Sequence, residues 1–183
     1  MLDAACGTGT YFGMVLESGR SVLGVDHAGA YLSRAAEKYP EVVTEHHDLQ
    51  DISHRDEFDG VMCVDAMEMI PPEDWPPVLE RFRRALRAQG RLYLTVEIAP
   101  QKEVRARNAE GRARGLPLAE GEVIWEDDGY HHYPPLDRVR RWLRDAGFEI
   151  ESEAEQMFED EPGFGYQHLI ARVEVRVPGS DPS

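Results

Sequence analysis

Cysteine is nearly absent from this sequence, and so are long apolar runs. The 183 residues include only two cysteines, Cys6 and Cys63, each within or beside an apolar strand-like stretch. A chain of this length can bury a sizeable core without disulfides, so we expect both thiols to be reduced. No run of about 18 apolar residues and no charged-then-apolar leader is seen, so we expect neither a membrane span nor a secretion signal. These features predict a single cytoplasmic domain.

Basic residues are scarce relative to acidic ones. The sequence has 20 Lys and Arg against 35 Asp and Glu, which gives a formal net charge of −15. Such a chain repels the phosphate backbone of DNA or structured RNA, whose binding depends on neutralisation by Lys and Arg. We therefore expect no nucleic-acid partner, and no membrane partner either.

A glycine-spaced turn near the start is the most informative motif. The apolar stretch Leu2-Asp3-Ala4-Ala5 runs into Cys6-Gly7-Thr8-Gly9-Thr10. Gly7 and Gly9 lack a Cβ, so the turn can bend sharply and its amides can approach a ligand closely. By itself such a pair is equally typical of an ordinary tight turn, so the surrounding sequence must decide.

The sequence after the turn favours a nucleotide-like ligand. A short helical pattern over residues 11–18 ends at Gly19, and the apolar strand Val22–Val25 then ends on Asp26. An acid at the carboxyl end of the second strand of a βαβ unit can accept hydrogen bonds from both hydroxyls of a ribose, so turn and acid together predict adenosine binding. Asp26 can also cap the helix that starts near Ala28, and the two roles are compatible.

A nicotinamide dinucleotide is the rival ligand for such a turn. Its fingerprint, Gly-x-Gly-x-x-Gly, has a third glycine that lets the helix pack closely on the strand. Here the third position is Phe12, whose ring argues against a pyrophosphate lying over the helix start.

These motifs, in this order, resemble those of the class I S-adenosylmethionine-dependent methyltransferases, over essentially the whole chain after residue 1. Asp3 to Gly9 resembles the family's first motif, acid-x-Gly-x-Gly-x-Gly, with Ala5 in place of the first glycine. The resemblance implies that Asp3 orients the amino group of S-adenosylmethionine, and that Gly7 and Gly9 lie beneath its methionine part. S-adenosylhomocysteine is then the product, and no metal site is expected.

The resemblance extends to the ribose and the adenine. It implies that Asp26 holds the ribose, and that Asp48, after a strand near Val42 to His46, holds the adenine amino group together with the following amide. The full set of expected cofactor contacts is Asp3, Ala4, Ala5, Cys6, Gly7, Thr8, Gly9, Asp26, His27, Asp48, Leu49 and Asp65.

The resemblance also implies a fold: a doubly wound, Rossmann-like α/β domain with a seven-stranded, mostly parallel sheet, helices on both faces and a C-terminal antiparallel hairpin. The residue pattern agrees, because strands and helices alternate along the chain. Further strands are predicted at Phe58–Val64, Arg91–Ile98, Phe148–Gln156 and Tyr166–Val177, and helices from Trp75 to a terminator at Gly90 and over Asp137–Ala146. We expect one domain over residues 1–177 and a frayed tail at 178–183.

Two charge patterns lie outside these motifs. Glu149, Glu151, Glu153 and Glu155 fall on every second residue, which predicts one solvated face of a strand. The segment Gln101–Gly115 is basic in an otherwise acidic chain. It is either a solvated surface helix or, within residues 101–133, part of a substrate lid that meets an anionic acceptor.

The methyl acceptor is expected near the stretch Gly129-Tyr130-His131-His132-Tyr133-Pro134-Pro135, interpreted as a loop on the carboxyl-end side of the sheet. Histidine can transfer protons near neutral pH, so His132, His131 and Tyr130 are the candidate catalytic residues. Tyr133 is a candidate substrate contact, and the resemblance adds Met67 and Glu68 after the fourth strand. The alternative is that a histidine caps the next helix, that the tyrosines pack and that Met67 belongs to the core.

The acceptor itself is expected to be a small molecule, methylated on oxygen or nitrogen. The chain reads Asp65-Ala66-Met67-Glu68 where enzymes that methylate nucleobase amines carry Asn-Pro-Pro-Tyr. The other function class left open is a cofactor-binding member of the same fold that does not methylate, either a rearrangement catalyst or a regulatory subunit. Relatives carry residues before the first strand, whereas Met1 lies in that strand here. Three interpretations are open: a natural minimal enzyme, a cover supplied by a partner or a second copy, or a truncated chain. We expect an open cofactor cleft that a homodimer or another partner can cover.

Overall fold

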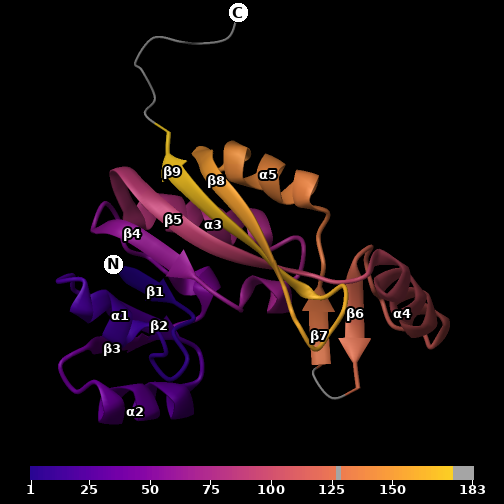
Figure 1. The fold of residues 1–183 in the computed structure, drawn as a ribbon, viewed down its shortest axis with the longest axis horizontal. Helices are drawn as coiled ribbons and strands as arrows, with labels where there is room; N and C mark the ends of the chain where they lie inside the picture. The colour runs from indigo at the N-terminus through magenta and orange to yellow at the C-terminus, as the bar shows by residue number, and fades with distance from the viewer. Residues whose placement is uncertain (127–128, 175–183) are drawn as a thin grey trace, which may run out of the picture.

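A seven-stranded sheet forms the centre of the computed structural model, which describes residues 1–126 and 129–174 (Figure 1). The strands lie in the order β3-β2-β1-β4-β5-β9-β8, with β1 to β5 parallel and β9 antiparallel to both β5 and β8. Their bounds are β1 Leu2–Ala4, β2 Leu23–Asp26, β3 Val43–His46, β4 Phe58–Cys63, β5 Leu86–Ile98, β8 Phe148–Met157 and β9 Gly165–Val173. The expected α/β fold, with its C-terminal hairpin, is confirmed.

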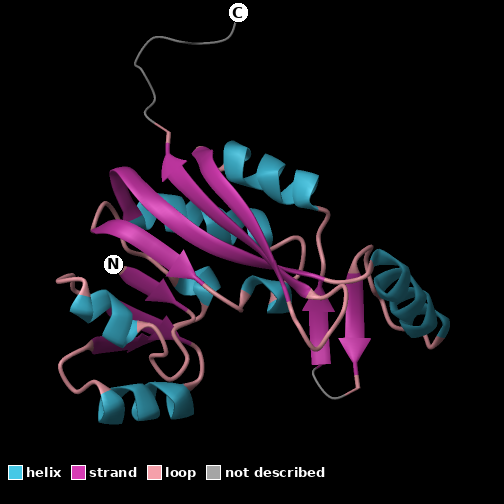
Figure 2. Ribbon diagram, viewed as in Figure 1, coloured by secondary structure: helices cyan, strands magenta, loops and turns pink. Residues whose placement is uncertain are grey.

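Helices cover both faces of the sheet (Figure 2). They are α1 Phe12–Glu17, α2 Gly29–Lys38, α3 Trp75–Ala85, α4 Gln101–Ala113 and α5 Leu136–Asp145. The larger core joins α3 and α5 to one face through side chains such as Phe82, Leu92 and Leu143, all 0% exposed. A smaller core packs Phe12 of α1 and Leu32 of α2 against the other face. In the described part of the chain, no helix is long and apolar enough to cross a membrane.

The start of β5 differs from the expectation. The helix α3 ends at Ala85, and Gly90 does not terminate it but lies inside β5. Leu86 is fully buried and pairs with Phe58, so burial and strand pairing begin directly after the helix. The backbone of β5 is irregular a few residues later, where Gln89 has a φ of +62°.

The glutamates of β8 do not share one face, so that expectation is wrong. The ladder between β8 and β9 shifts register at Glu151, where one extra residue is inserted. Glu149 lies opposite the partly exposed Arg172, whereas Glu153 lies opposite Leu169, which is 1% exposed and part of the larger core. A bulge of one residue reverses the alternation of side chains, and the carboxylates therefore divide between the two faces.

A second, two-stranded sheet stands beside the carboxyl end of β5. Strand β6 (Glu122–Trp125) pairs antiparallel with β7 (Gly129–His132), and α4 lies next to β6 (Figure 1). The stretch Gly129–Pro135 was expected to be a loop, and its first four residues are a strand instead. The basic segment is the helix α4. Residues 127–128 and the expected tail at 178–183 lie outside the described residues.

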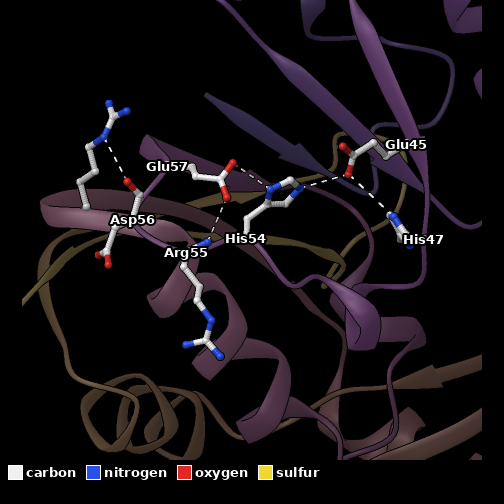
Figure 3. Close-up of polar contacts among 7 residues, drawn as sticks. Glu45, His47, His54, Arg55, Asp56 and Glu57 are labelled. Atoms are coloured by element: carbon white, nitrogen blue, oxygen red, sulfur yellow. Dashed lines mark hydrogen bonds and ion pairs between the residues drawn. The ribbon is translucent and has the colours of Figure 1, made fainter.

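One histidine ties the chain before β4 to the edge strand β3 (Figure 3). His54 Nε2 lies 3.1 Å from Glu45 Oε2, and His54 Nδ1 lies 3.1 Å from Glu57 Oε2. His47 approaches the same Glu45 oxygen at 3.8 Å. These contacts fix the connection between β3 and β4 on the side away from the hairpin.

Candidate active site

The glycine-spaced turn after β1 has the backbone that its sequence predicts. Ala5, Gly7 and Gly9 have φ values of +66°, +55° and +75°. A Cβ on Gly9 would lie 2.7 Å from the Phe12 ring, whereas a Cβ on Gly7 would meet nothing within 4 Å. Gly9 is therefore needed for packing against α1, and Gly7 borders open space. Ala5 holds a left-handed conformation that glycine adopts more easily, which is strain stored in the turn.

Asp26 connects this turn to the end of β2. Its Oδ2 accepts a hydrogen bond from Gly7 N at 2.8 Å, and its Oδ1 accepts one from Ala28 N at 2.8 Å. Asp26 is not the N-cap of α2, which is Ala28 and has no side-chain cap hydrogen bond, so the alternative role is wrong; Asp26 bonds the amide of that cap residue instead. Asp26 is 6% exposed, so its carboxylate holds the turn and α2 in a fixed relation.

Asp3 carries a buried carboxyl group at the same place. It is 1% exposed, and neither of its oxygens has a hydrogen-bond partner within the described residues. Burial raises the pKa of this carboxyl to about 7, and the negative charge of Asp26 acts in the same direction. A buried carboxylate without donors is costly, so the site lacks a cationic or hydrogen-bond-donating group. An ammonium group at the turn would supply both.

Other residues expected to contact the cofactor differ in how far their side chains are exposed. Ala4 is fully buried in the larger core, so only its backbone can face a ligand. Burial raises the pKa of the Cys6 thiol to about 12, which keeps it protonated. Asp48 is exposed and accepts a hydrogen bond from Gln50 N at 3.4 Å, and Leu49 beside it is buried. The side chain of His27 is 75% exposed, which puts it on the outer rim.

A second group of carboxylates lies past the ends of β4 and β5. Asp65 has a φ of +55°, its backbone N–H donates to Thr95 Oγ1 at 2.8 Å, and its Oδ1 accepts a hydrogen bond from Tyr166. Glu68, in the short 3-10 helix Met67–Met69, is 2% exposed. Burial raises the pKa of Glu68 to about 8, and the charges of Asp65 and Glu97 act in the same direction.

Strand β7 separates the predicted catalytic residues onto its two faces. His131 and Tyr133 stack with ring centroids 6.0 Å apart, and His131 Nε2 lies 3.7 Å from Glu97 Oε2. On the opposite face Tyr130 donates to Glu122 Oε1 at 2.6 Å. The alternation follows from strand geometry, which a loop would not have imposed. Of the two histidines, His131 is therefore the one that faces Glu97, near the end of β5.

His132 and Met67 are part of the packed interior. His132 is 0% exposed and lies edge-on to Trp75, with ring centroids 6.0 Å apart. Burial lowers the pKa of His132 to about 4, so the ring is neutral at pH 7. Met67 is also 0% exposed and belongs to the larger core. Met67 therefore fits its core alternative, whereas His132 packs in the interior and does not cap α5, whose N-cap is Pro135 without a side-chain cap hydrogen bond.

Several residues of this region were missed by the sequence analysis. A pocket of about 330 Å³ lies between β5, the β6–β7 hairpin and the turn before β9. It is lined by Glu97, Arg107, Trp125, Glu126, Tyr133, Glu161 and Phe164. Glu97 gave a usable signal, since it is a charged residue near the end of an apolar strand. Phe164 and Tyr166 gave none, because they come from a distant hairpin.

Comparison with known proteins gives the family. Residues 1–90 match a family model described as a methyltransferase domain. These residues form a methyltransferase domain, and the whole chain has the fold of the class I S-adenosylmethionine-dependent methyltransferases. No curated protein matches it by sequence.

Solved structures of this methyltransferase fold cover nearly all of the chain. A S-adenosylmethionine-dependent methyltransferase from Methanosarcina mazei is 18% identical with a TM-score of 0.82, over 96% of this chain and 92% of that one. The 1,6-didemethyltoxoflavin-N1-methyltransferase of Burkholderia thailandensis is 18% identical, with a TM-score of 0.72 over 95% and 70%. Magnesium protoporphyrin IX methyltransferase from Synechocystis is 21% identical, with a TM-score of 0.67 over 93% and 72%.

The residues of this methyltransferase fit its cofactor. S-adenosylmethionine supplies a methyl group on a sulfonium sulfur, and its methionine part carries an ammonium group. Asp3 is the carboxyl group that lacks a donor, and the open space at Gly7 leaves room for the methionine part. Asp26 would hold the ribose, and Asp48 with Leu49 lies at the adenine end. The expectation of this cofactor is thereby confirmed, while the individual contacts stay predictions.

Proposed function

We propose that this methyltransferase transfers the methyl group to an oxygen or nitrogen atom of a small molecule. The observation that supports it is the pocket beside Glu97, whose volume of about 330 Å³ is in the range of small-molecule sites. The pocket lies past the carboxyl end of β5, the edge at which ligands of open α/β sheets bind. Residues 101–133, proposed as a substrate lid, supply its walls at Arg107 and Trp125.

The charge of the molecule argues for the same class of acceptor. The net charge of −15 and the carboxylates past β4 and β5 oppose a phosphate backbone. Two proteins of the same fold are named for small acceptors, 1,6-didemethyltoxoflavin and magnesium protoporphyrin IX. Their identity to this chain is about one fifth, so they support the class of acceptor and not its identity.

The site can promote methyl transfer mainly by positioning. The step is an in-line displacement: a lone pair of the acceptor forms a bond to the methyl carbon, and the carbon–sulfur bond breaks with its electrons going to sulfur. In this proposal Asp3, Gly7 and Asp26 hold S-adenosylmethionine, which supplies the methyl carbon and the leaving sulfur. Glu68 and Glu97 lie on the acceptor side, where a carboxylate can take the proton that the acceptor loses.

Calorimetric titration of the purified chain with S-adenosylmethionine and S-adenosylhomocysteine is the first test. We expect micromolar binding of both, followed by release of S-adenosylhomocysteine when a panel of small alcohols, phenols and amines is added. A folded chain that binds neither compound would contradict the proposal. Tight binding without turnover on any acceptor would favour the second candidate, a non-methylating member of the fold.

A further inference from the structure

The acceptor side of the site concentrates negative charge at one place. Asp65 and Glu68 follow β4, and Glu97 lies near the end of β5; the Asp65 N–H donates to Thr95 Oγ1 at 2.8 Å, two residues before Glu97. Burial raises the pKa of Glu68, and the charges of Asp65 and Glu97 add to the rise. Like charges at short range repel, and desolvation adds to the cost. An arrangement of this kind is stable when a cation lies among the carboxylates.

Glu68 is an independent sign that something is bound there. It is 2% exposed, and neither of its oxygens makes a hydrogen bond of normal geometry within the described residues. A buried carboxylate costs several kilocalories per mole unless it is protonated or paired with a cation. The protonated Glu68 can donate to Asp65, which leaves one negative charge on the pair. A bound cation would balance that charge.

The neighbouring pocket adds aromatic walls to this charge. The Trp125 ring lies 6.3 Å from Tyr133 and 6.0 Å from Phe164, centroid to centroid, and both contacts are edge-on. Tyr133 connects the pocket to the carboxylates, since it lines the pocket together with Glu97 and stacks on His131, whose Nε2 lies 3.7 Å from Glu97 Oε2. Aromatic faces beside carboxylates are the usual surroundings of bound ammonium groups.

Arg107 is the basic residue among those that line the pocket. The Arg107 guanidinium lies 5.3 Å from the centroid of the Trp125 ring. The same pocket is lined by three carboxylates, those of Glu97, Glu126 and Glu161. Negative charge therefore exceeds positive charge, and the Arg107 contact shows that the Trp125 ring accepts a cation.

We propose that the methyl acceptor is an amine, bound as an ammonium ion with its nitrogen among Asp65, Glu68 and Glu97 and its carbon part in the pocket lined by Trp125 and Tyr133. This inference rests on the proposed function and narrows its acceptor from oxygen or nitrogen to nitrogen. It also replaces the anionic acceptor that the basic helix α4 suggested. The carboxylates favour an acceptor with a positive charge, and the aromatic rings favour one whose carbon part is apolar.

Proton removal precedes methyl transfer in this scheme. The bound ammonium ion gives one proton to the Glu97 carboxylate, which leaves a neutral nitrogen with a free lone pair. That lone pair bonds to the methyl carbon, and sulfur keeps the electrons of the broken carbon–sulfur bond. The product is an N-methylated ammonium ion that remains positively charged beside the carboxylates, and the proton on Glu97 leaves to solvent.

The test compares three probes of similar size on the full chain saturated with S-adenosylhomocysteine. Calorimetry at pH 7 measures the dissociation constants of benzylamine, benzyl alcohol and phenylacetate. We expect the cationic benzylamine to bind about fivefold or more tightly than the neutral alcohol, and phenylacetate to bind weakest. Equal binding of amine and alcohol, no binding of the amine, or a preference for phenylacetate would each overturn the inference.

Matched variants locate the effect. Glu97→Gln and Glu68→Gln should each reduce the preference for amine over alcohol to about twofold or less. Glu80→Gln removes a carboxylate on the exposed side of α3 and should leave the preference intact. A preference unchanged in both site variants contradicts the inference. Binding of S-adenosylhomocysteine is measured first, on the parent chain and on each variant. A parent chain that does not bind it would contradict the proposed function instead of this inference.

Discussion

The carboxylate of Asp26 accepts a hydrogen bond from the backbone N–H of Gly7 at 2.8 Å, which joins the ends of β2 and β1. Its other oxygen accepts from Ala28 before α2. The acid expected to hold the ribose therefore also shapes the turn expected to hold the methionine part. A substitution of Asp26 is therefore expected to affect both the ribose contact and the turn that holds the methionine part.

Asp26→Ala should weaken the binding of S-adenosylhomocysteine at least several-fold and should also lower stability. The variant leaves two partly buried N–H groups without their partner, at about 1–3 kcal/mol for such a group. Titration calorimetry and urea denaturation measure the two effects. Asp26→Asn is the matched control, because its amide keeps one oxygen acceptor and should lose less of both. An unchanged affinity in a folded Asp26→Ala chain would contradict the assignment of this motif.

Asp3 should make stability and cofactor binding depend on pH in opposite directions. Its pKa rises from the model-peptide value of 3.8 to about 7 on folding, so the folded state holds a proton that the unfolded state has lost. Its contribution to stability is thus complete below pH 3.8 and is lost as the pH rises through about 7. The ionised form is the one that pairs with an ammonium group, so cofactor affinity should rise over the same window.

Asp3→Asn separates these two effects. Thermal denaturation at pH 8 should give a higher melting temperature for the variant than for the parent, while its affinity for S-adenosylmethionine falls. The difference in melting temperature should shrink as the pH is lowered towards 4. A variant that is less stable than the parent at pH 8 would show that the buried carboxylate has a partner.

Two glycines of the cofactor half should respond to alanine in opposite ways. A Cβ on Gly24 would lie 2.4 Å from Phe12 Cζ and 2.8 Å from Cys6 Sγ, whereas a Cβ on Gly29 would meet nothing within 4 Å. Gly24→Ala should cost about 1–3 kcal/mol of unfolding free energy and weaken cofactor binding, because Phe12 supports the turn. Gly29→Ala, at the start of α2, should be neutral or stabilising by up to about 1 kcal/mol. Urea denaturation of the two variants checks this.

His132 should be dispensable for catalysis, in contrast to His131. His132→Phe should leave kcat/KM within about twofold of the parent, because the ring lies among core side chains and is neutral at pH 7. His131→Phe should reduce kcat/KM, because it removes the group that faces Glu97. A large loss of activity in a stable His132→Phe chain would restore this histidine as the catalytic candidate.

The same variant has a distinct pH signature in stability. The pKa of His132 falls from 6.5 to about 4 on folding, so the unfolded state binds the extra proton between these values. The parent therefore loses stability from this group as the pH falls from 6.5 towards 4, and His132→Phe should remove that loss. Denaturation curves of the two proteins, compared at pH 5 and pH 7, measure the difference.

Much of the cofactor half could be predicted because its determinants are local. The strand before Gly7, the turn itself and Asp26 after the next strand are contiguous patterns, and the positive φ values occur where the sequence has small residues. The bulge at Glu151 has no such local cause. It depends on how β8 meets β9 in space, and strict alternation of glutamates along the sequence pointed to a regular strand.

The acceptor half is less accessible to sequence reasoning, because its parts come from distant segments. Glu97, Tyr133 and Phe164 line one pocket but belong to β5, the chain after β7 and the turn before β9. The strand β7 was missed because its glycine and polar residues resemble a loop, and its identity decides which histidine faces Glu97. Topology therefore assigns the roles of His131 and His132.

The outermost strand β8 has a consequence for the molecule as a whole. Edge strands are the usual starting points of aggregation, because their unpaired backbone groups can recruit a strand from another molecule. β8 ends the sheet on one side, and its inserted residue and its carboxylates on both faces make it irregular and charged. An incoming strand would find neither a continuous register nor a flat apolar surface, so this edge is protected against β-sheet growth.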